Sequence, residues 1–151
     1  HFTALATGRL QASAAQVAAR YGFTHFVADG GYSLTVGGEI AEMKSLPVQD
    51  CIALIDRLQA ADIPWAVTPV NEAACVTSDK RYLDFAPPEY FPTQYDPAFD
   101  YRALDVLYKV TIVCTAEQEH EIDWATLPTL RYNRDILPSQ PTAQRNAHRR
   151  M

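Results

Sequence analysis

The first 28 residues constrain the fold most, because they have the pattern of a strand, a helix and a second strand. Residues 2–6 and residues 23–28 are short apolar runs. Between them, apolar residues recur at helical spacing, at Leu10, Ala14, Val17, Ala18 and Tyr21. Gly22 follows, at the position where a glycine commonly ends a helix. Units of this kind usually belong to parallel sheets with helices on their faces, so the sequence predicts an α/β fold.

From residue 29 onwards the pattern changes to one typical of an antiparallel sheet. Residues 32–36 and 39–43 alternate between apolar and polar side chains, and Gly37-Gly38 between them is typical of a two-residue hairpin turn. A helix is expected over residues 47–61, with Pro47 near its first position. These elements predict a second architecture in the same chain.

The rest of the chain continues this second architecture. Further strands are expected over 63–70, 73–77, 108–114 and 127–131, and further helices over 101–107 and 116–122. Pro64 and Pro69 interrupt the first of these strands, which favours a position near a sheet edge. The whole is an α/β protein, with an antiparallel-leaning sheet that carries helices on one face.

Composition and charge exclude several classes of protein. The chain has 151 residues and 48% hydrophobic content, enough for one domain with a core or two small lobes. No stretch approaches the roughly 18–20 apolar residues of a membrane helix. The net charge is −5, and because residues 131–151 carry five arginines and one acid, the remaining body is more acidic still. An acidic body does not suit nucleic acid as a partner, and the basic tail is expected to be solvated and flexible.

The three cysteines lie far apart and form no C-x-x-C pair, at Cys51, Cys75 and Cys114. They are expected to be reduced thiols buried in a cytoplasmic protein. They share no metal-ligand spacing with the histidines, so no metal site is expected on this chain. The first residue is His1, and an apolar strand follows at once. We therefore expect the chain to be a piece of a larger protein.

Thr7-Gly8-Arg9 is the first candidate site, since it lies between the first predicted strand and the first predicted helix. Ligands of open α/β sheets collect at such positions, and a helix amino terminus attracts phosphate. Thr7 supplies a hydroxyl donor, Gly8 allows close approach, and Arg9 adds a planar cation. The alternative is that Thr7 is an ordinary helix N-cap and Arg9 a solvated side chain.

A second candidate is the segment 78–100, in which aromatic residues and prolines alternate. A long loop of this kind tends to be functional, although its aromatic side chains would also serve as a cover over the core. Just before it, Lys80, Arg81 and Tyr82 are candidates to meet a phosphorylated substrate, with an ordinary turn as the alternative. The acids around His120 are expected to form a solvated helix face.

The run of residues 2–9, the helix after it, and Asp29-Gly30 before a Gly-Gly hairpin resemble the haloacid dehalogenase (HAD) superfamily. More narrowly, they resemble the Cof-type sugar-phosphate phosphatases, which have a large α/β cap. The resemblance covers about residues 1–137. It implies that Thr7 is the phosphate-binding residue of the second motif, with Gly8 and Arg9 beside it. Asp29-Gly30 takes the position of the Asn-Gly pair that opens the cap in that family.

The resemblance also implies a division of the chain. Residues 1–28 would be part of a Rossmann-like core, 29–137 the substrate-specificity cap, and 138–151 the tail. The parent would be a Mg²⁺-dependent phosphatase of small phosphorylated substrates. The family's nucleophilic Asp-x-Asp, its lysine and its metal-binding acids have no counterpart in this sequence, so we expect the chain alone to be inactive.

Two other functions stay open at this point. One is a non-catalytic interaction module that uses the aromatic loop 82–101, and the other is the cap of a HAD phosphosugar mutase. If residues 1–28 are part of a core whose other strands are missing, their strands would present unpaired edges, which predicts a homo-oligomer formed through them.

Overall fold

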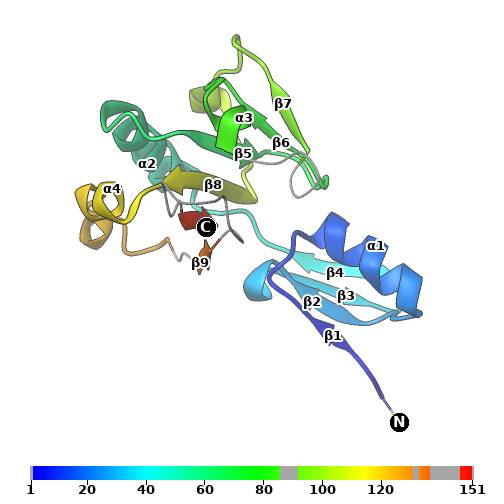
Figure 1. Cartoon of the computed structure of the whole chain (residues 1–151). Helices are drawn as coiled ribbons and strands as arrows, with labels where there is room; N and C mark the ends of the chain where they lie inside the picture. Colours follow the sequence, from blue (N-terminus) through cyan, green and yellow to red (C-terminus); the bar gives the residue numbers. More distant parts are fainter. Residues whose placement is uncertain (1, 86–91, 131–132, 137–146, 151) are drawn as a thin grey trace. The chain divides into compact units, whose positions relative to one another are not determined.

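A computed structural model describes residues 2–85, 92–130, 133–136 and 147–150 (Figure 1). The chain divides into two compact units. Unit 1 comprises His1–Ser45 and Val70–Ala73, and unit 2 comprises Leu46–Pro69 and Ala74–Met151. This division separates the two compact parts of the chain. The boundary expected after residue 28 instead separates the expected core from the expected substrate-specificity cap. That functional boundary therefore stays a prediction.

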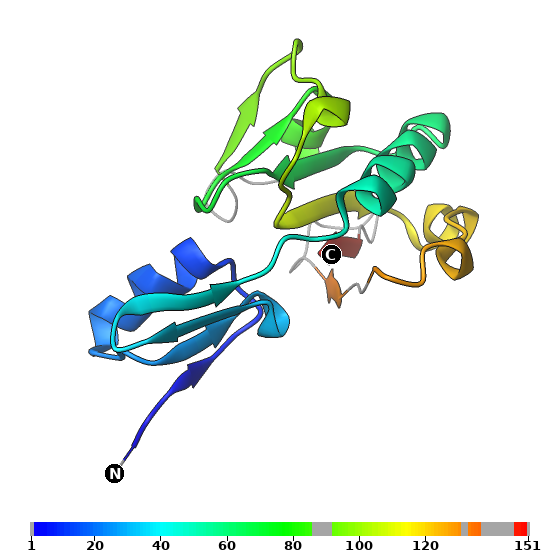
Figure 2. The same ribbon diagram turned by 180° about the vertical axis from the view of Figure 1, so that it is seen from behind.

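Unit 1 is a four-stranded mixed sheet in the order β1-β2-β3-β4, with one helix packed against it (Figure 2). β1 pairs with β2 in parallel, and the other neighbours pair antiparallel. The elements are β1 (Leu5–Ala6), α1 (Gln11–Tyr21), β2 (Phe26–Ala28), the 3₁₀ turn η1 (Asp29–Gly31), β3 (Ser33–Val36) and β4 (Glu39–Met43). The predicted strand, helix, strand and hairpin are all confirmed.

The core of unit 1 is small because α1 contacts the sheet mainly through alanines. Ala14 and Ala18 of α1 pack against Phe26 and Ala28 of β2, and all four are buried. α1 ends as predicted at Gly22, whose φ of 74° lies in the left-handed region that a side chain disfavours. The opposite face of this sheet exposes apolar side chains instead, among them Val27, Leu34 and Val36.

Unit 2 is built on a six-stranded sheet in the order β7-β6-β5-β8-β10-β9. Its strands are β5 (Trp65–Thr68), β6 (Cys75–Thr77), β7 (Thr93–Tyr95), β8 (Lys109–Cys114), β9 (Asn133–Ile136) and β10 (Ala147–Arg150). Its helices are α2 (Val48–Ala60), α3 (Tyr82–Phe85) and α4 (Ala116–Glu121), with 3₁₀ turns η2 (Tyr101–Ala103) and η3 (Trp124–Thr126). The mixed α/β fold class is thus confirmed.

The predicted edge position of the strand over 63–70 is wrong. β5 lies inside the sheet, between β6 and β8, and all its residues are buried. Pro64 and Pro69 flank β5 rather than interrupt it, so neither proline removes a hydrogen bond from the strand itself. The carbonyl of Pro64 accepts a bond from Val113 N–H at 3.0 Å, which extends the pairing with β8.

Two other predicted elements differ from the structure. Residues 127–130 form no strand, and the strand of this region is β9, further along the chain. The helix expected over 101–107 is only the 3₁₀ turn η2. β10 falls within the predicted basic tail, where it pairs with both β8 and β9.

The three cysteines are free and buried, as predicted. Burial raises the pKa of the Cys51 thiol to about 12, with a smaller contribution from the negative charge of Asp50. The thiol therefore stays protonated and unreactive at neutral pH.

Candidate functional site

Five predicted site residues come together in unit 1, at the edge where parallel strands β1 and β2 end. They are Thr7, Gly8, Arg9, Asp29 and Gly30. Backbone bonds join the two segments: the N–H of Asp29 donates to the carbonyl of Arg9 at 2.7 Å, and that of Gly30 donates to the carbonyl of Thr7 at 3.4 Å. Residues far apart in sequence thus form one site because the carboxyl ends of parallel strands meet.

Residues 7–9 form a turn, called the 7–9 turn below, in which the Thr7 hydroxyl and the Gly8 N–H are available as hydrogen-bond donors. Thr7 is half-buried, whereas Gly8 and Arg9 are exposed. The Thr7 hydroxyl accepts a bond from the N–H of Arg9 at 3.2 Å, so its own proton stays available for a ligand. Within the described residues, the N–H of Gly8 makes no hydrogen bond. A Cβ at Gly8 would meet no atom within 4 Å, so a ligand can approach the backbone there.

The amino terminus of α1, by contrast, is already paired. Leu10 is the N-cap residue and supplies no side-chain bond. Asp29 Oδ2 accepts from the N–H of Gln11 at 3.0 Å, and Asn71 Oδ1 accepts from that of Ala12 at 3.2 Å. Thr7 therefore does not cap the helix, contrary to the alternative considered from the sequence. An anion at this site would meet the 7–9 turn rather than these two helix donors.

Asp29 is held in an unusual backbone conformation. Its φ is 54°, in the left-handed region, and Gly30 follows with a φ of 63°. Among residues with a side chain, Asp and Asn tolerate this region best. The bonds of Asp29 to Arg9 and Gln11 fix its backbone and carboxylate together.

Sequence reasoning did not find the partners that α1 makes through Gln11. Gln11 Nε2 donates to Thr35 Oγ1 at 3.3 Å, and Asn71 Nδ2 donates to Gln11 Oε1 at 2.7 Å. The one available signal was a glutamine on the otherwise apolar face of α1, which asks for a buried polar partner.

The three candidates of unit 2 do not form a site with one another. Lys80 is exposed, and Tyr82 is fully buried among Ala66, Cys75 and Val113. Tyr82 is therefore a core residue, and the prediction that it meets substrate is not supported by its position.

Arg81 is exposed but already paired with two carboxylates. It bonds Asp79 at 3.0 and 2.7 Å and Asp62 at 2.5 Å. The hydrogen bond to Asp79, and then that to Asp62, raise the pKa of the guanidinium above its ordinary value. Its charge is thus paired within the fold, with Asp79 of the same turn and with the distant Asp62.

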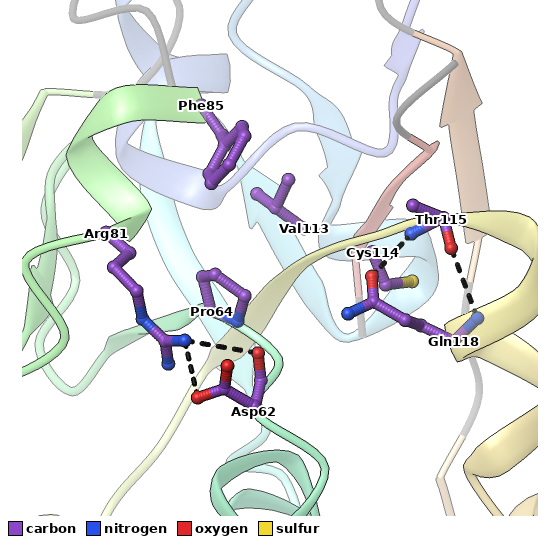
Figure 3. A pocket seen from close by; sticks show the side chains of 8 residues that line it. All are labelled: Asp62, Pro64, Arg81, Phe85, Val113, Cys114, Thr115 and Gln118. Atoms are coloured by element: carbon purple, nitrogen blue, oxygen red, sulfur yellow. Dashed lines mark hydrogen bonds and ion pairs between the residues drawn. The ribbon is translucent and has the colours of Figure 1, made fainter. Parts of the chain in front are cut away.

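A pocket of about 230 Å³ lies beside Arg81 (Figure 3). Its lining residues are Asp62, Pro64, Arg81, Phe85, Val113, Cys114, Thr115 and Gln118. Arg81 bonds Asp62, and Thr115 and Gln118 bond each other in a capping box at the start of α4 (Figure 3). Because its polar groups bond one another, this pocket offers a charged ligand little.

The aromatic loop 82–101 has buried and exposed aromatic side chains among its described residues, and Tyr95 is one of the exposed ones. Besides Tyr82, Tyr101 is buried, and its hydroxyl donates to Asp56 at 2.5 Å. Phe85 packs against the core cluster around Tyr82. Tyr90 and Phe91 lie outside the described residues.

Within the described residues, no three His, Cys, Asp or Glu side chains are grouped so that they could hold a metal ion. None of the helices in those ranges combines the length and the apolar character that a membrane span requires.

No protein-family model matches the chain, and no curated protein sequence matches it. Solved structures do match. A hypothetical protein from Geobacillus kaustophilus aligns with a TM-score of 0.71 and 20% identity, over 98% of this chain and 55% of that one. A HAD subclass IIB sugar phosphatase aligns with a TM-score of 0.63 and 16% identity, over 97% of this chain and 55% of the other.

A haloacid dehalogenase-like hydrolase from Bacteroides thetaiotaomicron gives a TM-score of 0.66 and 15% identity, over 97% of this chain and 56% of its own. The chain thus has the fold of these structures, two of which are described as HAD-type proteins. It spans about half the length of these structures.

Proposed function

We propose that this chain is the substrate-binding portion of a HAD-type phosphatase that hydrolyses phosphomonoesters, and that these are sugar phosphates. The observation that carries the proposal is the 7–9 turn: a hydroxyl proton on Thr7 and an unused N–H on Gly8 stand together at the end of β1. Two donors side by side suit a phosphoryl oxygen. The likeness in fold to a HAD sugar phosphatase favours a phosphoryl group as the ligand of these two donors.

Arg9 supplies the positive charge of the proposed site. Its side chain is exposed, and its N–H and carbonyl are both held, by Thr7 and Asp29. A fixed backbone with an exposed guanidinium lets the side chain reach the phosphate of the substrate. Gly30 joins the second segment to the turn through its N–H, which donates to the Thr7 carbonyl, and its φ of 63° lies in the left-handed region that favours glycine.

The residues of this site do not fit a magnesium ion. Asp29 is the carboxylate beside the 7–9 turn, and one of its oxygens accepts the N–H of Gln11. Mg²⁺ prefers several oxygen ligands in octahedral geometry. We therefore propose that the whole enzyme uses Mg²⁺ held by carboxylates outside this chain, together with the nucleophile, and that the isolated chain does not turn over substrate.

The test is a titration of the ¹⁵N-labelled chain with inorganic phosphate, followed by NMR. The amide signals of Gly8 and Arg9 should shift with saturation, and Thr7→Ala should weaken binding roughly tenfold through the loss of a hydrogen bond to a charged group. Thr24→Ala is the matched control, since Thr24 is an exposed threonine of the same unit. Absence of any shift at Gly8 would contradict the proposed phosphate site. Metal-dependent hydrolysis of p-nitrophenyl phosphate by the chain would contradict its inactivity.

The alternatives fare differently. The interaction module loses two aromatic anchors, because Tyr82 and Tyr101 are buried. The mutase cap stays open, and a requirement of the whole protein for a sugar bisphosphate would favour it. Cytoplasmic location stays a prediction.

A further inference from the structure

The segment Val70–Ala73 leaves the hairpin of β5 and β6 and belongs to unit 1. Within unit 1, both polar atoms of the Asn71 side chain bond the first turn of α1. Its Oδ1 accepts from the N–H of Ala12 at 3.2 Å, and its Nδ2 donates to Gln11 Oε1 at 2.7 Å. Asn71 is thus a helix cap that comes from a distant part of the chain.

Gln11, which bonds Asn71, also makes a hydrogen bond in the core of unit 1. Its Nε2 donates to Thr35 Oγ1 at 3.3 Å, and both Gln11 and Thr35 are buried. The Ala12 N–H can donate only to the oxygen of the Asn71 amide, so that amide has one possible orientation. The orientation of the Gln11 amide then follows, because Asn71 Nδ2 must donate to its oxygen. A network of this kind, buried at Gln11 and Thr35 and part-buried at Asn71, holds its side chains in one geometry.

The same first turn fixes the 7–9 turn. Because Leu10 provides no cap, the helix start depends on Asp29 and Asn71. Asp29 bonds both Gln11 N–H and the Arg9 carbonyl, so the helix start and the 7–9 turn share one anchor. Displacing the first turn of α1 therefore displaces Arg9 as well.

We propose that Asn71 is a positioning residue that holds the 7–9 turn in its ligand-ready geometry through the first turn of α1. That the ligand is a phosphoryl group rests on the proposed function, whereas the ordering of the turn does not. Asn71 touches no substrate atom in this scheme. It acts through Ala12, Gln11 and the shared anchor at Asp29.

The experiment compares the full 151-residue chain with three variants. Asn71→Ala removes both bonds, Asn71→Asp keeps the acceptor for Ala12, and Glu72→Ala changes an exposed neighbour as the matched control. Hydrogen exchange of the Ala12 amide and ¹⁵N relaxation of Gly8 and Arg9 are measured without ligand. Amides of α2 in unit 2 report whether each variant is folded.

Asn71→Ala should speed exchange at Ala12 roughly three- to tenfold, the usual effect of losing a helix cap. It should also lower the order parameters of Gly8 and Arg9 from about 0.85 toward 0.6. Asn71→Asp should stay close to the parent at Ala12, because its acceptor is kept and a negative charge suits a helix amino terminus. Glu72→Ala should change neither.

The proposal is overturned if Asn71→Ala speeds hydrogen exchange at Ala12 but leaves the order parameters of Gly8 and Arg9 unchanged. Asn71 would then only cap the helix. If Asn71→Ala does not fold, failure of Asn71→Asp to keep the parent's exchange at Ala12 overturns it. Phosphate titration separates the two proposals: no binding by the parent chain contradicts the proposed function alone, and parent-like phosphate binding by a disordered Asn71→Ala contradicts the positioning role.

Discussion

The 7–9 turn of unit 1 and residues 79–81 of unit 2 (the Arg81 turn) both carry an arginine, yet they use their polar groups in opposite ways. Arg81 is enclosed by bonds to Asp79 and Asp62, whereas Gly8 keeps an unused N–H and Thr7 an available hydroxyl proton. A polar group that is satisfied within the fold stabilises the fold, and one left open is available for a ligand. The comparison separates a structural turn from a candidate binding turn better than the residue types do.

The largest expected effect on stability is that of truncating Tyr82, the buried residue next to Arg81. Tyr82→Ala removes a fully buried aromatic side chain that packs against Ala66, Cys75 and Val113. We expect the free energy of unfolding to fall by about 3 kcal/mol, because the cavity cannot be filled by its neighbours. Denaturant unfolding measures this loss, with the exposed Lys80→Ala as the control. A loss below about 1 kcal/mol would mean that Tyr82 is not the core residue described above.

The two turns also show what sequence could and could not predict. The 7–9 turn and the hairpin at Gly37-Gly38 follow from local patterns and from the rule that ligands collect at strand ends. Asp29 became a candidate only through the family resemblance. Asn71 was missed because its bonds join segments that no local pattern connects. The burial of Tyr82 was missed for a related reason: an aromatic beside basic residues looks the same in sequence whether it faces a ligand or the core.

The second prediction concerns the edge of unit 1, beside the 7–9 turn. β1 is the outermost strand of its sheet, and Leu5 and Thr7 donate their N–H groups to carbonyls on the β2 side. The N–H of Ala6 therefore points to the open edge, where a second copy of the chain can pair. We expect light scattering to give a mass above that of one chain.

Ala6→Pro tests this edge specifically. It removes the outward N–H while leaving the bonds of Leu5 and Thr7 intact, since proline is tolerated at a strand edge. The variant should be monomeric with an unchanged circular dichroism spectrum. A monomeric parent at high concentration would rule out the homo-oligomer.

The third prediction concerns the hydroxyl of Tyr101, the buried last residue of the aromatic loop 82–101. Burial, and then the hydrogen bond to Asp56, raise the pKa of Tyr101 from 10.0 to about 12. The folded state thus favours the neutral phenol, so this stabilisation is fully present below pH 10 and is lost as the pH rises toward 12. Tyr101→Phe should show a shallower fall in stability across that window. Equal slopes for the parent and the variant would show that Tyr101 is not the group responsible.

The smallest expected effect on stability is that of replacing Arg81. Its side chain is 45% exposed, so solvent screens its bonds to Asp79 and Asp62. Arg81→Gln should cost less than about 1 kcal/mol of stability and leave phosphate binding at the 7–9 turn unchanged. Arg9→Gln should do the reverse, with stability unchanged and phosphate bound more weakly, because its guanidinium is exposed at the open donors. If Arg81→Gln were instead the variant that weakened phosphate binding, the roles assigned to the two arginines would have to be exchanged.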